Sequence, residues 1–126
     1  MPGRSTSMAD GWETRRRRGP GHDWAIVRLG APGQIVRIEI DTNHYKGNYP
    51  DRASIDACLA PDASLAALES APWIEMLPAS KLGPHRRQMF VRELTGRHAI
   101  VSHVRLNIFP DGGVSRLRVH GIVAMA

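Results

Sequence analysis

Short segments in which apolar and polar residues alternate, separated by turn residues, run through most of this chain. Successive side chains of a β-strand point to opposite faces of the sheet, so apolar residues at every second position indicate a strand with one buried face. No segment carries the pattern of a long helix. About seven strands with turn signals between them therefore predict an all-β chain, in the form of an antiparallel β-sandwich or jelly roll.

The predicted strands span residues 24–30, 34–42, 53–60, 73–80, 86–94, 102–110 and 113–121. Ala31-Pro32-Gly33 between the first two indicates a tight turn, so we expect these strands to form a hairpin. The sequence PDGG at 110–113 is a second turn signal, and we expect a β-bulge beside it. The alanine-rich segment 61–71 has no β-branched residue and predicts a short helix, with a loop as the alternative.

The predicted core follows from the faces of these strands. In residues 34–42 and 102–110 every second residue is apolar, and the last strand shows the same alternation in its second half. The side chains expected inside the sandwich are Val36, Ile38, Ile40, Val104, Leu106, Ile108, Leu117 and Val119.

The length of 126 residues fits one domain with one core. We expect residues 1–9 to be a disordered tail, because they are small and polar, and residues 10–126 to form the domain. The chain has one cysteine, Cys58, so an internal disulfide is excluded and a reducing compartment is favoured. No apolar run reaches the roughly 18 residues of a membrane helix, and the N-terminus lacks a secretory signal. These features predict a soluble cytoplasmic protein without a membrane partner.

The net charge of +5 comes mostly from one run, because Arg15–Arg18 contribute four of the five charges. The rest of the chain is nearly neutral and shows no groove-reading or base-stacking module. We therefore expect the run to be a solvated face or a local anion contact, and expect no nucleic-acid partner.

The stretch DTNHYKGNYPD, Asp41–Asp51, gathers an acid, a histidine, a lysine and two asparagines directly after a strand. This is the inventory of a ligand-binding loop, and the alternative is a tight turn built by Asp41, Gly47 and Asn48. His44 in this stretch and His85 before a later strand are either general acids or bases near neutral pH or hydrogen-bonding turn residues.

Metal-ligand spacing is absent, since no second cysteine and no His-x-x-x-His pair accompanies these histidines. His44 with Asp41 is only a weak signal for a metal, so no metal or other cofactor is predicted. Cys58 lies within a strand pattern, and we interpret it as a small core residue rather than a nucleophile.

A polar face is expected if the last two strands pair as a hairpin. Arg105 and Asn107 would then lie near Arg116 and Arg118, and such a cluster can hold a carboxylate through two hydrogen bonds. The alternative is that these arginines lie on an outer sheet face and pair with Glu39 or Asp111, since outer faces of antiparallel sheets are normally polar.

Three strings in order resemble the allantoicase repeat: DGWETRRRRGPGHDWAIVRLGAPGQIVRIEIDTNHYKGNYPD, LPASKLGPHRRQMF and SHVRLNIFPDGGVSRLRVHG. The resemblance extends from Asp10 to Gly121. It implies a galactose-binding-like β-sandwich and hydrolysis of allantoate to ureidoglycolate and urea in purine (allantoin) catabolism. Members of this family carry two repeats, and DTNHYKGNYP is more similar to the second. With one repeat, the chain is expected to be a truncated product, a fragment or one half of a split enzyme, with a second repeat or further copies of itself as partner.

The implied substrate is a small anion with one carboxylate and two ureido groups. The candidates for proton transfer are His44, Asp41, His85 and Glu13, and the candidates for substrate binding are Lys46, Asn48, Arg105, Asn107 and Arg116. Two other functions stay open: a non-catalytic module that binds a small ligand or carbohydrate, and a structural half that assembles with a partner repeat.

Overall fold

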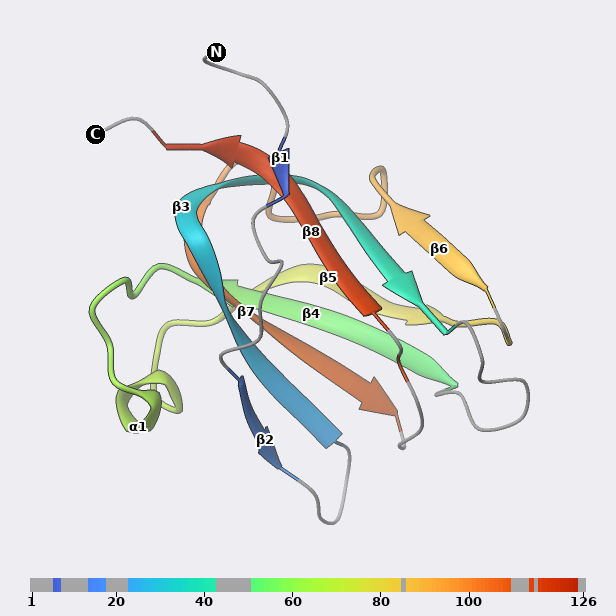
Figure 1. Ribbon diagram of the computed structural model, residues 1–126, viewed down its shortest axis with the longest axis horizontal. Coiled ribbons are helices and arrows are strands. Elements are labelled where there is room, and N and C mark those ends of the chain that lie inside the picture. The colour runs from blue at the N-terminus through green and yellow to red at the C-terminus, as the bar shows by residue number, and fades with distance from the viewer. Residues whose placement is uncertain are drawn as a thin grey trace.

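The part of the chain that the computed structural model describes comprises residues 6–7, 14–17, 23–42, 51–84, 86–109, 114 and 116–124. It is built almost entirely from strands (Figure 1). The strands are β1 (Thr6–Ser7), β2 (Thr14–Arg17), β3 (Asp23–Asp41), β4 (Arg52–Cys58), β5 (Ile74–Lys81), β6 (Arg87–Phe90), β7 (Ile100–Phe109) and β8 (Arg116–Val123). The helix α1 (Leu65–Leu68) lies between β4 and β5 and confirms the short helix predicted there. No helix in these ranges is long and apolar enough to cross a membrane.

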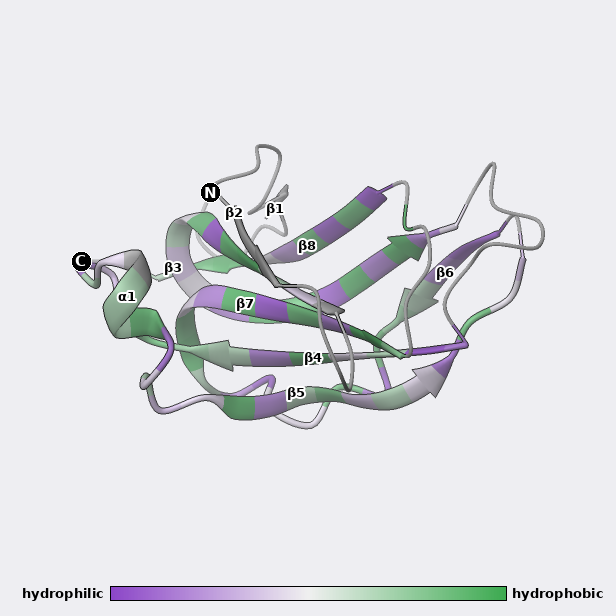
Figure 2. Ribbon diagram, turned by 90° about the horizontal axis from the view of Figure 1, so that it is seen from below, coloured by the Kyte–Doolittle hydropathy of each residue, from purple (hydrophilic) through white to green (hydrophobic). Residues whose placement is uncertain are grey.

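The 19-residue strand β3 organises the sandwich. Its first part pairs with β7, and its second part pairs with β8 on one side and β6 on the other. All described pairings are antiparallel, in the order β1-β8-β3-β7-β4-β5. β3 bends between these two parts, so one continuous sheet folds into two layers, with β8 and β6 on one side and β4 and β5 on the other (Figure 2).

The hairpin predicted at Ala31-Pro32-Gly33 is therefore wrong. The chain does not turn back here but passes from one layer to the other, and Gly33 pairs with both Val101 of β7 and Val123 of β8. A Cβ atom at Gly33 would overlap the backbone carbonyl of Ile122. Glycine is needed at this position because of that close approach of β8, and a hairpin turn is not the reason.

The last two predicted strands do not form a hairpin either. β7 lies between β3 and β4 in one layer, whereas β8 lies between β1 and β3 in the other. The turn signal and the bulge predicted beside it fall at residues 110–113, which lie outside the described residues. β1 lies within the segment 1–9, and its two residues pair with Gly121 and His120.

One apolar core fills the space between the layers. Of the eight predicted core residues seven are buried, and Val36 is the exception. The pairing of β3 with β8 shifts between Ile35 and Arg37, which marks a bulge at Val36. The bulge leaves Val36 half-buried and turns Ile35, which is fully buried, toward the core.

The close packing of the core predicts a large loss of stability when one of its side chains is shortened. Leu106, at 6% exposure, belongs to the cluster that joins both layers. Leu106→Ala is expected to lower the free energy of unfolding by about 2–5 kcal/mol, the usual range for a large-to-small change in a packed core. Chemical denaturation measures this loss. Leu59→Ala is the matched control, because Leu59 is 50% exposed, and an equal loss in both variants would contradict the described packing.

Candidate functional site

One end of the sandwich is held by hydrogen bonds around Thr42, where β3 ends. The buried Thr42 hydroxyl donates to the carbonyl of Gly83 (2.7 Å) and accepts from the N–H of Arg86 (3.1 Å). The backbone N–H of Thr42 donates to the Arg86 carbonyl (2.8 Å). These bonds fix the segment before β6 against the end of β3, and Arg87 is the next residue along the chain.

Asp51, directly before β4, is also held by backbone hydrogen bonds at this end of the sandwich. The N–H of Asp51 donates to the carbonyl of Phe109 at the end of β7 (3.0 Å), and the Asp51 carbonyl accepts from Leu82 (3.0 Å). Residues 43–50, which contain most of the predicted ligand loop, thus connect two anchored points at this end of the sandwich. The segment itself lies outside the described residues.

The outer face of β3, β6 and β8 carries charged side chains in register beside these anchors. Asp41 on the central strand pairs with Arg87 of β6 and with Arg116 of β8. Two residues earlier, Glu39 pairs with Met89 on β6 and with Arg118 on β8. The alternation explains this arrangement: Ile38 and Ile40 point to the core, so Glu39 and Asp41 must point away from it.

Five of these side chains line an open depression. We call it the arginine depression, and its residues are Glu39, Asp41, Arg87, Arg116 and Arg118. Three guanidinium groups against two carboxylates leave a formal charge of +1. The depression therefore suits a small anion that also offers hydrogen-bond donors.

The three arginines of this depression are available to a ligand. Within the described ranges, the guanidinium groups of Arg87, Arg116 and Arg118 take part in no hydrogen bond or ion pair. Arg87 and Arg116 are exposed and Arg118 is half-buried. A guanidinium group has five N–H donors in a planar fork that matches a carboxylate, so two adjacent ones can bind a carboxylate strongly.

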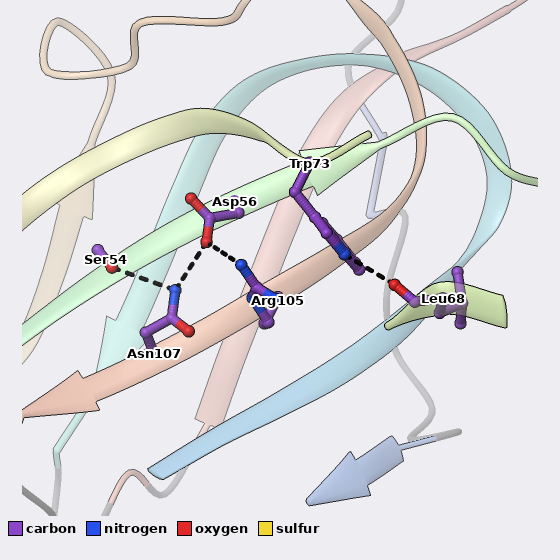
Figure 3. A network of polar contacts seen from close by, with 6 residues as sticks. All are labelled: Ser54, Asp56, Leu68, Trp73, Arg105 and Asn107. Atoms are coloured by element: carbon purple, nitrogen blue, oxygen red, sulfur yellow. Dashed lines mark hydrogen bonds and ion pairs between the residues drawn. The ribbon is translucent and has the colours of Figure 1, made fainter. Parts of the chain in front are cut away.

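A second polar cluster lies on the outer face of the other layer (Figure 3). A guanidinium N–H of Arg105 donates to Oδ2 of Asp56 (2.8 Å), and the Asn107 amide donates to the same oxygen (3.1 Å) and to the Ser54 hydroxyl (3.2 Å). We call these four residues the β4–β7 network. Their contacts join two neighbouring strands, Asp56 having Arg105 as its cross-strand partner.

An aromatic side chain covers this network. The guanidinium carbon of Arg105 lies 4.9 Å from the ring centre of Trp73, within the range of a cation–π interaction. The Trp73 indole N–H donates to the carbonyl of Leu68 at the end of α1 (2.8 Å). Arg105 is thus occupied by an ion pair and an aromatic face, and the network serves to attach α1 and its flanking loops to the sheet.

The structure brings only some of the predicted site residues together. Asp41 and Arg116 meet in the arginine depression. Arg105 and Asn107 lie in the opposite layer, so the predicted grouping of these two with Arg116 and Arg118 does not form. The remaining predicted residues, Glu13, His44, Lys46, Asn48 and His85, lie outside the described residues.

Two members of the depression, Glu39 and Arg87, were not predicted as site residues. The sequence placed Arg87 only within a strand and Glu39 only in the alternative of an ordinary surface pair, whereas Arg118 was expected in a carboxylate-binding cluster, but with Arg105 and Asn107. Their shared position depends on β3 lying between β6 and β8, which periodicity within each strand does not reveal. The available signal was the run of outward charges Arg37, Glu39 and Asp41 on one strand.

Cys58 is a core residue, as predicted. It is 2% exposed and packs with Ile26 and Leu68 in a small cluster beneath α1. Burial raises the pKa of its thiol, and the positive charge of Arg105 opposes this by less. Among the described residues, no three His, Cys, Asp or Glu side chains gather in a way that would hold a metal ion.

Comparison with known proteins gives consistent matches. The family model of the allantoicase repeat matches residues 1–124. A probable allantoicase of Pseudomonas paraeruginosa is 56% identical over 122 residues, which are 95% of this chain and 36% of the relative. The allantoicase of Dictyostelium discoideum is 54% identical over 123 residues, 95% of this chain and 33% of the relative. The chain thus spans about a third of the length of the curated relatives that it matches.

Solved structures confirm the fold. The crystal structure of allantoicase from Saccharomyces cerevisiae matches with a TM-score of 0.66 and 39% identity, over 96% of this chain and 34% of that one. The N-terminal domain of the single-strand break repair protein XRCC1 matches with a TM-score of 0.63 over 92% of this chain and 93% of that domain. At 14% identity the second likeness concerns the fold alone. The galactose-binding-like β-sandwich expected from the sequence is the fold of this chain.

Proposed function

This chain belongs to the allantoicase family, and on that premise we propose that it takes part in the hydrolysis of allantoate to ureidoglycolate and urea. The observation that carries the proposal is the identity of 54–56% to relatives named allantoicase or probable allantoicase, over 95% of this chain. Sequence identity of this extent is evidence about the reaction, which the fold by itself does not determine.

We propose that the arginine depression is the place where allantoate binds. The substrate carboxylate needs cations, and Arg87 and Arg116 carry guanidinium groups without a partner within the described ranges. The ureido groups need hydrogen-bond acceptors, and the carboxylates of Glu39 and Asp41 line the same depression. One set of side chains can meet both requirements, and it lies at the end of the sandwich where hydrogen bonds hold Thr42 and Asp51 on either side of residues 43–50.

The reaction exchanges one carbon–nitrogen bond for a carbon–oxygen bond. The oxygen of water joins the central carbon of allantoate, one ureido nitrogen leaves, and a proton from water ends on the departing urea. We propose His44 as the group that gives this proton, with Asp41 as the base toward water. Lys46 would attract the anion, and Asn48 would contact a ureido group. These assignments rest on the sequence pattern of the loop.

Mutations in the loop test these roles. His44→Ala is expected to lower turnover by about 10²–10⁴-fold with the fold intact, because it removes a proton donor in the transition state. Lys46→Ala is expected to raise mainly KM, as for binding lost equally from ground and transition states. Steady-state kinetics with allantoate measures both. Full activity in the double variant would exclude the loop from the chemistry.

We propose that full activity needs the other part of the protein that the relatives contain. The support is the length ratio, since this chain spans 33–36% of the first two relatives. The test measures urea release from allantoate by the purified chain, alone and mixed with a polypeptide carrying the remainder of a relative. Greater urea release from the mixture than from the chain alone is the expected result. Equal release from both would contradict the need for the other part, and absence of release from both would contradict the proposed reaction.

A further inference from the structure

Glu39 differs from the other residues of the arginine depression in its burial. Its side chain retains only 9% exposure although it lies on the outward face of β3. One of its carboxylate oxygens, Oε1, lies 3.7 Å from Nε of Arg37 and 3.8 Å from Nε2 of His120. Both distances lie within reach of an ion pair but exceed the length of a hydrogen bond.

The other carboxylate oxygen, Oε2, is buried and accepts no hydrogen bond within the described part of the chain. Buried polar atoms in proteins are nearly always hydrogen-bonded, and each exception calls for a specific reason. Oε2 belongs to a residue that lines the depression, so a small movement of the Glu39 side chain would present this carboxylate to a donor that enters the depression. Such a donor would satisfy an acceptor that is already desolvated and needs little further ordering.

The chemistry of that donor follows from the surrounding charges. A second carboxylate in this place would face the negative charge of Glu39, whereas an N–H group would be accepted by it. Arg87, Arg116 and Arg118 line the same depression and favour a negative group close by. The depression therefore matches a ligand that carries both a carboxylate and ureido N–H groups.

We propose that Glu39 is a specificity-determining residue, whose Oε2 accepts a hydrogen bond from a ureido N–H of the ligand while the arginines hold its carboxylate. This inference rests on the proposed function and deepens it, because it assigns the selection of ureido acids over other small anions to one side chain. Glu39 discriminates against dicarboxylates by charge repulsion and selects N–H donors by hydrogen bonding, which are two separate effects.

The test compares two ligands on the wild-type chain and on Glu39→Gln, with calorimetry or NMR titration as the readout. Allantoate carries one carboxylate and ureido N–H groups, and oxalate carries two carboxylates without any N–H. Glu39→Gln is expected to lower the affinity for allantoate roughly tenfold to a hundredfold, the range for a hydrogen bond to a charged group. The same substitution is expected to raise the affinity for oxalate, because it removes a charge of the same sign as the ligand. Damage to the fold would lower the affinity for both ligands and would not change the two affinities in opposite directions.

The outcomes separate this inference from the proposed function. If wild-type protein does not bind allantoate, the proposed site fails, and this inference fails with it. If wild-type and Glu39→Gln bind allantoate equally well, only the role of Glu39 is overturned. Glu75→Gln, an exposed glutamate of β5, is the control and is expected to change neither affinity. Should Glu39→Gln fail to fold, Glu39→Asp is the second variant, because it keeps the charge but has a shorter side chain that draws the oxygens back. We expect Glu39→Asp to lower the affinity for allantoate without raising the affinity for oxalate.

Discussion

Replacing both Arg87 and Arg116 with alanine is expected to weaken the binding of allantoate by about 10²–10⁴-fold. Each guanidinium can form charge-assisted hydrogen bonds to the substrate carboxylate, and a bond of this kind contributes about 1.5–3 kcal/mol. Two such contributions correspond to the stated range. The two residues lie on either side of Asp41 across β6 and β8, so neither can substitute fully for the other.

The measurement is the dissociation constant for allantoate, accompanied by a thermal unfolding curve. Arg92→Ala with Arg97→Ala is the matched control, because both residues are exposed and the pair removes the same charge. The control is expected to bind allantoate within about threefold of wild type, since charges away from the site act only through a screened field. An equal loss in both double variants would mean that net charge, and not the depression, attracts the ligand.

Gly33→Ala is expected to cause a larger loss of stability than the same substitution at Gly83 or Gly96. The new Cβ would overlap the carbonyl of Ile122, which is backbone of the paired strand β8 and cannot rotate away. The strands must separate at the corner where β3 passes between the layers, and we expect a cost of about 3 kcal/mol or more.

Gly83→Ala provides the comparison for this prediction. A Cβ at Gly83 would meet the guanidinium end of Arg86 at 3.3 Å, and this flexible side chain can move. We therefore expect Gly83→Ala to change the melting temperature little, and Gly33→Ala to lower it by several degrees or to prevent folding. Equal melting temperatures for the two variants would show that the corner of β3 tolerates a side chain and is not closely packed.

The sequence predicted the strands well because each is a local pattern. The alternation in residues 102–110 placed Val104, Leu106 and Ile108 inside, and all three are buried. It failed at Val36 because one extra residue in a bulge reverses the alternation, and no residue type marks that position. It also failed at Gly33, where the same tripeptide fits a hairpin turn or a crossing between layers, and only the position of β8 decides between them.

The candidate site was harder to predict than the fold, because it depends on which strands lie side by side. Arg105 and Arg116 are equivalent in the sequence, each an outward arginine on an alternating strand. In the structure Arg105 has the carboxylate of Asp56 as its partner, whereas Arg116 lines the depression beside Asp41. The family resemblance indicated the substrate but not the strand order, so it could not separate these two arginines.

The most direct test of the proposed allantoate site is an NMR titration of the chain with allantoate, which follows backbone amide and arginine side-chain signals. The site proposed here predicts that shifts concentrate in the arginine depression, at residues 39–41, 87 and 116–118, and spare the β4–β7 network on the opposite layer. Shifts centred on Asp56, Arg105 and Asn107, or no saturable shifts at all, would contradict it.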